Sequence, residues 1–181
     1  MGGDGDGVTA SAVDLRKPEV FEALYDATLP GIYGYFLRRC GGRVTTAEDL
    51  TSETYLRAIA QIRRGGGIDE PTRWLYGIAR HTLIDHYRAS LRESDRFLPW
   101  SERAERAPDD HDAFTQVLER EQAIAALDRL APAQRVVLVL RYLDGLRVAE
   151  IAEATGKSEH AVESLLARGR ATFKRYYRES D

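Results

Sequence analysis

The chain has 181 residues, of which 43% are hydrophobic and 30% charged, a composition that indicates one or two small folded domains rather than a disordered protein. No run of about 18 apolar residues occurs, and the acidic, glycine-rich start lacks the basic and apolar parts of a signal peptide, so we expect a cytoplasmic protein. The single cysteine, Cys40, excludes an internal disulfide and a multi-cysteine metal site.

The formal net charge of −3 is unevenly distributed along the chain. Residues 1–92 are neutral, residues 93–134 carry −5, and residues 135–181 carry +2 and end in a basic run. A modest basic patch suits contact with phosphates, but it predicts weak DNA binding by this chain alone.

Four helices are predicted in the first half. After a disordered tail at 1–16, Pro18 suits a helix start, and a second helix follows from Leu29 to Cys40. The capping-box pair Thr45 and Glu48 predicts the start of a third helix, which ends near residue 63.

Three consecutive glycines at 65–67 predict a loop, which lacks the GxxxxGK[ST] pattern of a nucleotide site. A fourth helix is expected over 72–89. The segment that follows, up to residue 112, shows no sustained period and many charges, so it is interpreted as a linker.

Helical periodicity resumes near residue 113, and Pro132 restarts the helix before an apolar stretch that Asp144 and Gly145 end. No internal repeat and no period-2 strand pattern is found. The sequence therefore predicts an all-α protein with two small helical bundles, at 17–92 and 113–178, joined by a flexible acidic linker at 93–112.

A helix-turn-helix motif is predicted at 146–170. Ala152, Gly156 and Val162 supply the small, glycine and branched apolar residues at the spacing typical of this motif. Gly156 can adopt the left-handed conformation that ends the first helix, and the Ser158 hydroxyl can cap the second. A plain helical hairpin with a glycine cap is the alternative for this segment taken alone.

Two segments of the first half, AEDLTSETYLRAI (47–59) and TRWLYGIARHTLIDHYR (72–88), resemble region 2 of the extracytoplasmic-function group of bacterial RNA polymerase sigma factors. The segment 126–175 resembles region 4 of the same group. The resemblance implies an alternative sigma factor, a non-enzymatic subunit without cofactor or metal. Such a subunit binds core RNA polymerase, recognises promoter DNA, promotes its opening and is inhibited by an anti-sigma factor.

Two other functions compete with this interpretation. A self-sufficient helix-turn-helix regulator would bind operator DNA as a dimer without polymerase. A small enzyme is disfavoured, because the sequence shows no set of nucleophile, base and orienting group, no phosphate loop and no metal cluster.

The resemblance also assigns residues to three surfaces. The surface for core polymerase comprises Asp49, Glu53, Leu56 and Arg57. The surface for the melted minus-ten element comprises Trp74, Tyr76, Arg80, His81, Asp85, Tyr87 and Arg88, with 89–95 as the loop that captures a base. The surface for the minus-thirty-five element comprises Ser158, Glu159, His160, Glu163, Ser164, Arg168, Arg170 and Lys174.

Alternatives stay open for several of these residues. The steps of four from Asp49 through Glu53 to Arg57 also suit a solvated, salt-bridged helix face. Trp74 and Tyr76 suit either a core or a DNA surface. The family often has asparagine at the position of His81, and a basic residue and an arginine at those of Glu163 and Leu165. Glu163 therefore either reads a cytosine or points away from the groove.

Overall fold

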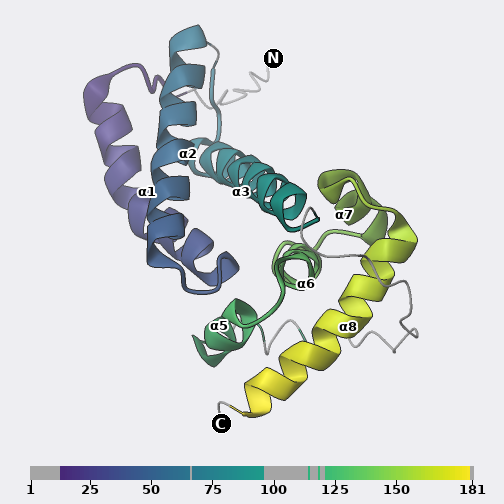
Figure 1. Cartoon of the computed structure of the whole chain (residues 1–181). Helices are drawn as coiled ribbons and strands as arrows, with labels where there is room; N and C mark the ends of the chain where they lie inside the picture. Colours follow the sequence, from purple (N-terminus) through teal and green to yellow (C-terminus); the bar gives the residue numbers. More distant parts are fainter. Residues whose placement is uncertain (1–12, 66, 96–113, 115–117, 119–120, 180–181) are drawn as a thin grey trace, which may run out of the picture.

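The computed structural model describes residues 13–65, 67–95, 114, 118 and 121–179, and within them the all-α prediction is confirmed. One bundle contains α1 (Pro18–Arg39), α2 (Val44–Arg64) and α3 (Pro71–Asp95) (Figure 1). The other contains α5 (Glu121–Asp128), α6 (Pro132–Leu138), the π-helical turn η1 (Val139–Leu143), α7 (Val148–Thr155) and α8 (Glu159–Arg178). In the part of the chain that the structure describes, no helix combines the length and apolar character needed to cross a membrane.

Helix α1 replaces the two helices predicted around Pro30. Pro30 lies on the exposed side of one continuous helix, where the carbonyl that proline cannot bond is close to solvent. Ile32 and Phe36 are fully buried about two turns and one turn before the helix end, and the Thr28 hydroxyl donates to the Leu24 carbonyl at 2.6 Å. Continued burial of one face therefore outweighs the local preference of proline for a helix end.

Helix α2 begins two residues earlier than the capping-box pattern predicted. Arg43 occupies the N-cap position and makes no side-chain capping bond, so Thr45 lies inside the first turn and the predicted capping box is wrong. Gly41 and Gly42 both have positive φ and separate α1 from α2, as expected from the sequence.

Helix α3 is longer than predicted and runs to Asp95. Leu83, Tyr87 and Leu91 follow one another at steps of four and are all at least 96% buried, so the apolar face continues past the expected end. The segment 89–95 is therefore helical and not a loop. The predicted tail at 1–12 and the predicted linker from residue 96 onwards lie outside the described residues.

The helix-turn-helix prediction is confirmed in its local details. Gly156 has φ +70° and ψ 23° at the end of α7, the left-handed conformation expected there. The Ser158 hydroxyl accepts a hydrogen bond from the Ala161 N–H at 3.2 Å and caps α8. Val162 is completely buried, so α8 packs its inner face on the bundle core.

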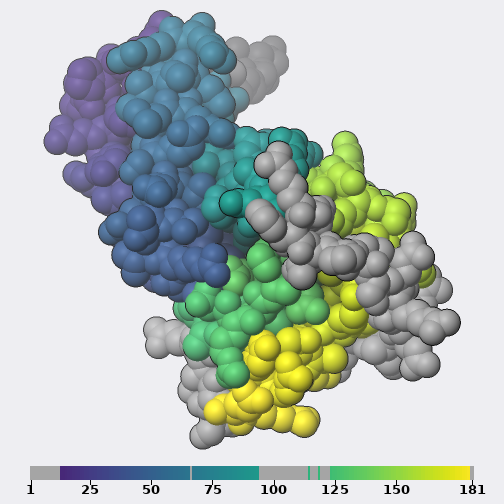
Figure 2. Space-filling view, in the orientation of Figure 1, coloured from purple at the N-terminus to yellow at the C-terminus, as the bar shows by residue number. Residues whose placement is uncertain are grey.

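The two bundles pack directly on one another. Helix α3 lies against α6 and α7, and the surfaces of α3 and α7 meet in the space-filling view (Figure 2). The polar bridges between the bundles include an ion pair from Arg43 to Asp128 at 2.8 Å and another from Arg39 to Asp144 at 2.9 Å.

Candidate nucleic-acid interface

The residues expected to face polymerase lie on one outer face of α2. Asp49, Glu53 and Leu56 are exposed, and the Leu56 side chain is 63% exposed, unusual for leucine. Arg57 is half-buried and pairs with Glu53 and with Asp85 of α3, both at 2.8 Å. The charged part of this face is thus salt-bridged, whereas the apolar side chain of Leu56 cannot form a salt bridge.

Beside Leu56 a groove of about 600 Å³ opens between α1 and α2. It is lined by Tyr25, Leu29, Pro30, Tyr33, Glu48, Thr51, Ser52, Tyr55, Leu56 and Ile59. The α1 residues of this groove were not predicted from the sequence. An apolar stripe on one helix does not show which of its residues the neighbouring helix covers and which remain exposed.

The aromatic residues expected at the minus-ten surface separate into three environments. Trp74 is half-buried, and its indole N–H donates to Gln61 Oε1 at 3.2 Å. Tyr76 packs edge-on against Tyr35 of α1, with ring centroids 6.0 Å apart. Tyr87 is 4% exposed and donates its hydroxyl to the Arg39 carbonyl at 2.8 Å, so it is a core residue.

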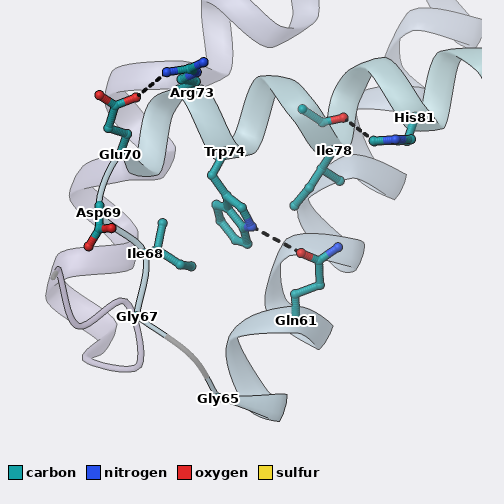
Figure 3. Close-up of a pocket in the computed structure, with 11 residues that line it drawn as sticks. Gln61, Gly65, Gly67, Ile68, Asp69, Glu70, Arg73, Trp74, Ile78 and His81 are labelled. Carbon is teal, nitrogen blue, oxygen red and sulfur yellow. Dashed lines mark hydrogen bonds and ion pairs between the residues drawn. The ribbon is translucent and has the colours of Figure 1, made fainter.

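Trp74 borders a cavity of about 870 Å³ between the end of α2 and the start of α3 (Figure 3). It is lined by Gln61, Gly65, Gly67, Ile68, Asp69, Glu70, Arg73, Trp74, Gly77, Ile78 and His81. The loop of this cavity is held at Ile68, whose carbonyl accepts from the Val13 N–H at 3.2 Å. The loop residues beside this cavity are Gly65 and 67–70, whereas 89–95, predicted as the loop that captures a base, forms the last turns of α3.

The charged residues of α3 point to different neighbours. His81 is exposed at the cavity and its Nδ1 lies 2.8 Å from the Gly77 carbonyl oxygen. Asp85 is held by Arg57, as described above. Arg80 is exposed, whereas Arg88 donates to backbone carbonyls of α7 and so faces the other bundle.

On α8, the predicted groove-reading residues are only partly exposed. Ser158 is the helix cap, Glu159 and His160 are exposed, and Glu163 is half-buried. Ser164 is only 4% exposed, and among the described residues its hydroxyl has no hydrogen-bond partner, so its predicted exposure is wrong.

The basic residues of α8 also differ in direction. Arg170 donates to the Tyr142 hydroxyl of η1 at 2.8 Å, and Arg168 donates to the Ser164 carbonyl at 3.4 Å, whereas Lys174 is exposed. Leu165, where the family often has arginine, is 5% exposed and belongs to the core of this bundle. Leucine at this position therefore follows from its burial.

Comparison with known proteins assigns both bundles. Residues 24–93 match the family model of sigma-70 region 2, and residues 120–173 match that of sigma-70, region 4. The ECF RNA polymerase sigma factor SigF of Caulobacter vibrioides is 31% identical over 147 residues, which cover 81% of this chain and 79% of that protein. The chain belongs to the ECF group of sigma factors.

Other relatives agree with this assignment. The ECF RNA polymerase sigma factor BldN of Streptomyces coelicolor is 37% identical over 166 residues, 88% of this chain, which spans 61% of that protein's length. A solved structure of the RsbN–BldN complex aligns with 32% identity over 90% of this chain and 94% of that chain, with a TM-score of 0.35. The two family models and the sequence relatives support an alternative sigma factor over a self-sufficient helix-turn-helix regulator.

In this sigma factor, the region 2 match covers most of α1, all of α2 and α3 up to residue 93. The exposed Leu56 and the cavity at Trp74 therefore both belong to region 2, on different faces of it. The region 4 match ends at residue 173, inside α8, and includes the whole helix-turn-helix.

Proposed function

We propose that this sigma factor docks on core RNA polymerase through the exposed face of α2, comprising Asp49, Glu53, Leu56 and Arg57. The observation that carries the proposal is Leu56, a large apolar side chain 63% exposed beside an apolar groove of about 600 Å³. An uncovered apolar patch with a charged rim is typical of a protein-binding surface. Asp49 and Glu53 supply that rim.

Promoter opening is assigned to the cavity at the start of α3. An unstacked base needs an aromatic surface and polar groups that can bind its edge. Trp74 supplies the aromatic surface, and the loop residues Asp69 and Glu70 supply acceptors beside it. Tyr76, His81 and Arg80 surround this end of the helix, so we place the melted minus-ten strand across it.

The minus-thirty-five element is assigned to the start of α8. Glu159 and His160 are exposed in the first turn after the Ser158 cap, where side chains of a recognition helix reach base edges. Lys174, exposed about four turns further on, is suited to a phosphate contact that positions the helix without reading sequence.

An anti-sigma factor is the third proposed partner. BldN was solved in complex with RsbN, and a sigma factor of Bartonella quintana was solved in complex with the anti-sigma factor NepR. We infer that this chain has an inhibitor of the same kind and acts in the cytoplasm together with polymerase, as a transcription initiation factor rather than an enzyme.

Run-off transcription with core polymerase and genomic promoter fragments tests the proposal. Leu56→Glu places a charge in the apolar contact and should lower transcript yield at least about tenfold, without changing thermal stability. Val44→Glu is the matched control, because Val44 is 52% exposed on α2 and lies outside the proposed face. Initiation by Leu56→Glu at the wild-type level would exclude this docking face, and no initiation by the wild type above core alone would exclude the function.

A further inference from the structure

The segment 13–17, directly before α1, is bonded to the loop of the cavity at Trp74. The Val13 N–H donates to the Ile68 carbonyl at 3.2 Å, and the two residues form an isolated antiparallel bridge. Helix α1 begins at the same end of its bundle at which α2 ends, so the segment that enters α1 passes this loop (Figure 1). The bridge therefore joins the loop to a part of the chain outside the three helices of the bundle.

Leu15 fixes this segment to the protein. Its side chain is 4% exposed, whereas that of Val13 is 38% exposed. Among the described residues, Leu15 is not a member of the continuous apolar core that the two bundles share. Burial of a leucine side chain is favourable wherever it occurs, so Leu15 can hold the segment without being part of that core. Loss of this side chain should release the segment and leave the core intact.

Local hydrogen bonds keep the segment compact. The Leu15 N–H donates to the Val13 carbonyl at 3.1 Å, and the Lys17 N–H donates to the Asp14 carbonyl at 3.3 Å. The Asp14 carboxylate accepts a further bond from the Arg16 N–H at 3.2 Å. Turns that follow one another in this way leave the backbone few alternative conformations. The Val13 N–H is therefore presented to the loop by an ordered backbone.

On the other side of the bond, Ile68 connects the segment to the cavity. Ile68 lines the cavity, and Figure 3 shows its side chain directed to the side on which Trp74 lies. Gly65 and Gly67 belong to the same loop, and Gly65 has φ +86°. Glycine loses more conformational freedom than other residues when a loop becomes ordered. A bond at Ile68 therefore lowers the entropy that this glycine-rich loop must lose when it closes on a ligand.

We propose that the segment 13–17 is a positioning element of the minus-ten site, in which the buried Leu15 anchors the segment and the Val13 N–H holds Ile68 in place beside the cavity. This inference rests on the proposed function for its consequence, because a preordered loop binds an unpaired base more tightly than a loop that must first become ordered. Val13 and Leu15 act through Ile68 and are therefore positioning residues.

Two pairs of variants separate the backbone bond from the side chains around it. Val13→Pro removes the N–H donor, and Val13→Ala keeps it, so the alanine variant is the matched control at the same exposed position. Leu15→Ala removes the anchor, whereas Leu15→Met nearly preserves its volume and should restore wild-type behaviour. Circular dichroism should show the wild-type helix content in all four variants, because neither position belongs to the continuous core.

Fluorescence of the free full-length chain tests the positioning without polymerase. Trp74 and Trp100 are the two tryptophans, so Trp100→Phe leaves Trp74 as the single indole fluorophore. We expect a red-shifted emission and a larger acrylamide quenching constant in Val13→Pro and Leu15→Ala, because a released loop exposes the Trp74 ring. Val13→Ala and Leu15→Met should match the parent. Unchanged emission and quenching in both disrupting variants would overturn the positioning role.

Transcription with core polymerase tests the consequence for promoter opening. One template is a duplex promoter, and the other is the same promoter with mismatched bases across the minus-ten element. Val13→Pro and Leu15→Ala should lower transcript yield about fivefold on the duplex and less than about twofold on the mismatched template, whose bases are already unpaired. A fault in folding or in polymerase binding would lower both yields equally, and that result would overturn the proposal. Wild-type yield on the duplex would also overturn it.

The inference and the proposed function fail separately. Greater exposure of Trp74 in both disrupting variants, with no initiation by the wild type above core alone, would uphold the positioning of the loop and exclude the function. Initiation by the wild type, with the same Trp74 emission and quenching in all variants, would uphold the function and exclude the positioning role.

Discussion

Tyr87 has the residue type expected to stack on an unpaired base, but its surroundings assign it to the core. Its ring is 4% exposed and its hydroxyl is bonded to the Arg39 carbonyl. Burial raises the pKa of this phenol well above its usual value. Residue type thus identifies a candidate for base stacking. Whether its ring is exposed depends on the helix that packs against it, and sequence periodicity does not identify that helix.

Replacement of Tyr87 by phenylalanine separates these two roles. Tyr87→Phe removes the bond to a carbonyl at the end of α1 and should lower the free energy of unfolding by about 1 kcal/mol in urea titrations. Binding of single-stranded DNA by this variant should not change. Tyr25→Phe, on an exposed ring of the same bundle, is the control and should leave stability unaltered. A loss of DNA affinity with unchanged stability would instead return Tyr87 to the DNA surface.

At the scale of the helices, the features predicted correctly are those with local causes. Gly156, Ser158 and Pro132 act within one turn of their own position, so their roles follow from the sequence. The ends of α1 and α3 were wrong for the opposite reason. Pro30 and the charged segment after Ala89 are locally unfavourable, and burial against other helices carries the helix through them.

Two glycines test this distinction between local causes and packing. Gly156 has positive φ and Gly77 lies inside α3, and at both an added Cβ would meet no atom within 4 Å. Gly156→Ala should lower the free energy of unfolding by about 1 kcal/mol, because only backbone strain is added. Gly77→Ala should raise it by about 0.5 to 1 kcal/mol, because alanine favours a helix. Urea unfolding measures both changes in the free energy of unfolding. A change of the same sign in the two variants would contradict the assignment of backbone strain to position 156.

At the scale of the whole molecule, the sequence predicted two bundles and not their contact. Asp144 was interpreted as a helix end, whereas its ion-pair partner lies 105 residues away in α1. Local charge patterns do not identify such partners. The three functional surfaces could be proposed from motifs in the sequence. The orientation of Arg88 toward α7, in contrast, follows only from the packing of the two bundles.

We expect His86 to make the contact between the bundles dependent on pH. It lines a cavity of about 380 Å³ between α3 and α6, which Cys40, Arg43, Thr46, Tyr87, Ala89, Ser90, Glu93, Pro132, Arg135 and Val136 also line. Burial lowers the pKa of His86, and the charges of Arg43 and Arg135 lower it further. The neutral His86 ring is therefore favoured while the bundles are packed together. Its contribution to their packing is complete above the ordinary pKa of about 6.5 and is lost as pH falls through the lowered value.

We expect the radius of gyration of the wild type to increase as pH is lowered from about 7.5 to about 5.5. His86→Gln should flatten this change, whereas His81→Gln, an exposed histidine of the same helix, should keep it. The raised pKa of Asp144 acts in the opposite direction, because protonation of that buried carboxyl favours the packed bundles at lower pH. An equal pH response in the two histidine variants would contradict the assignment to His86.

Because both bundles belong to one chain, the pairing of Arg39 with Asp144 is an intramolecular equilibrium. Its position is independent of dilution, since a tethered partner acts at an effective concentration on the order of millimolar. A free inhibitor or a polymerase subunit that separates the bundles must compete with this tethered contact. Its apparent affinity equals its intrinsic affinity multiplied by the fraction of molecules whose bundles are separated. Cellular abundance of the sigma factor alone therefore sets how many molecules exist, and not what share of them is open.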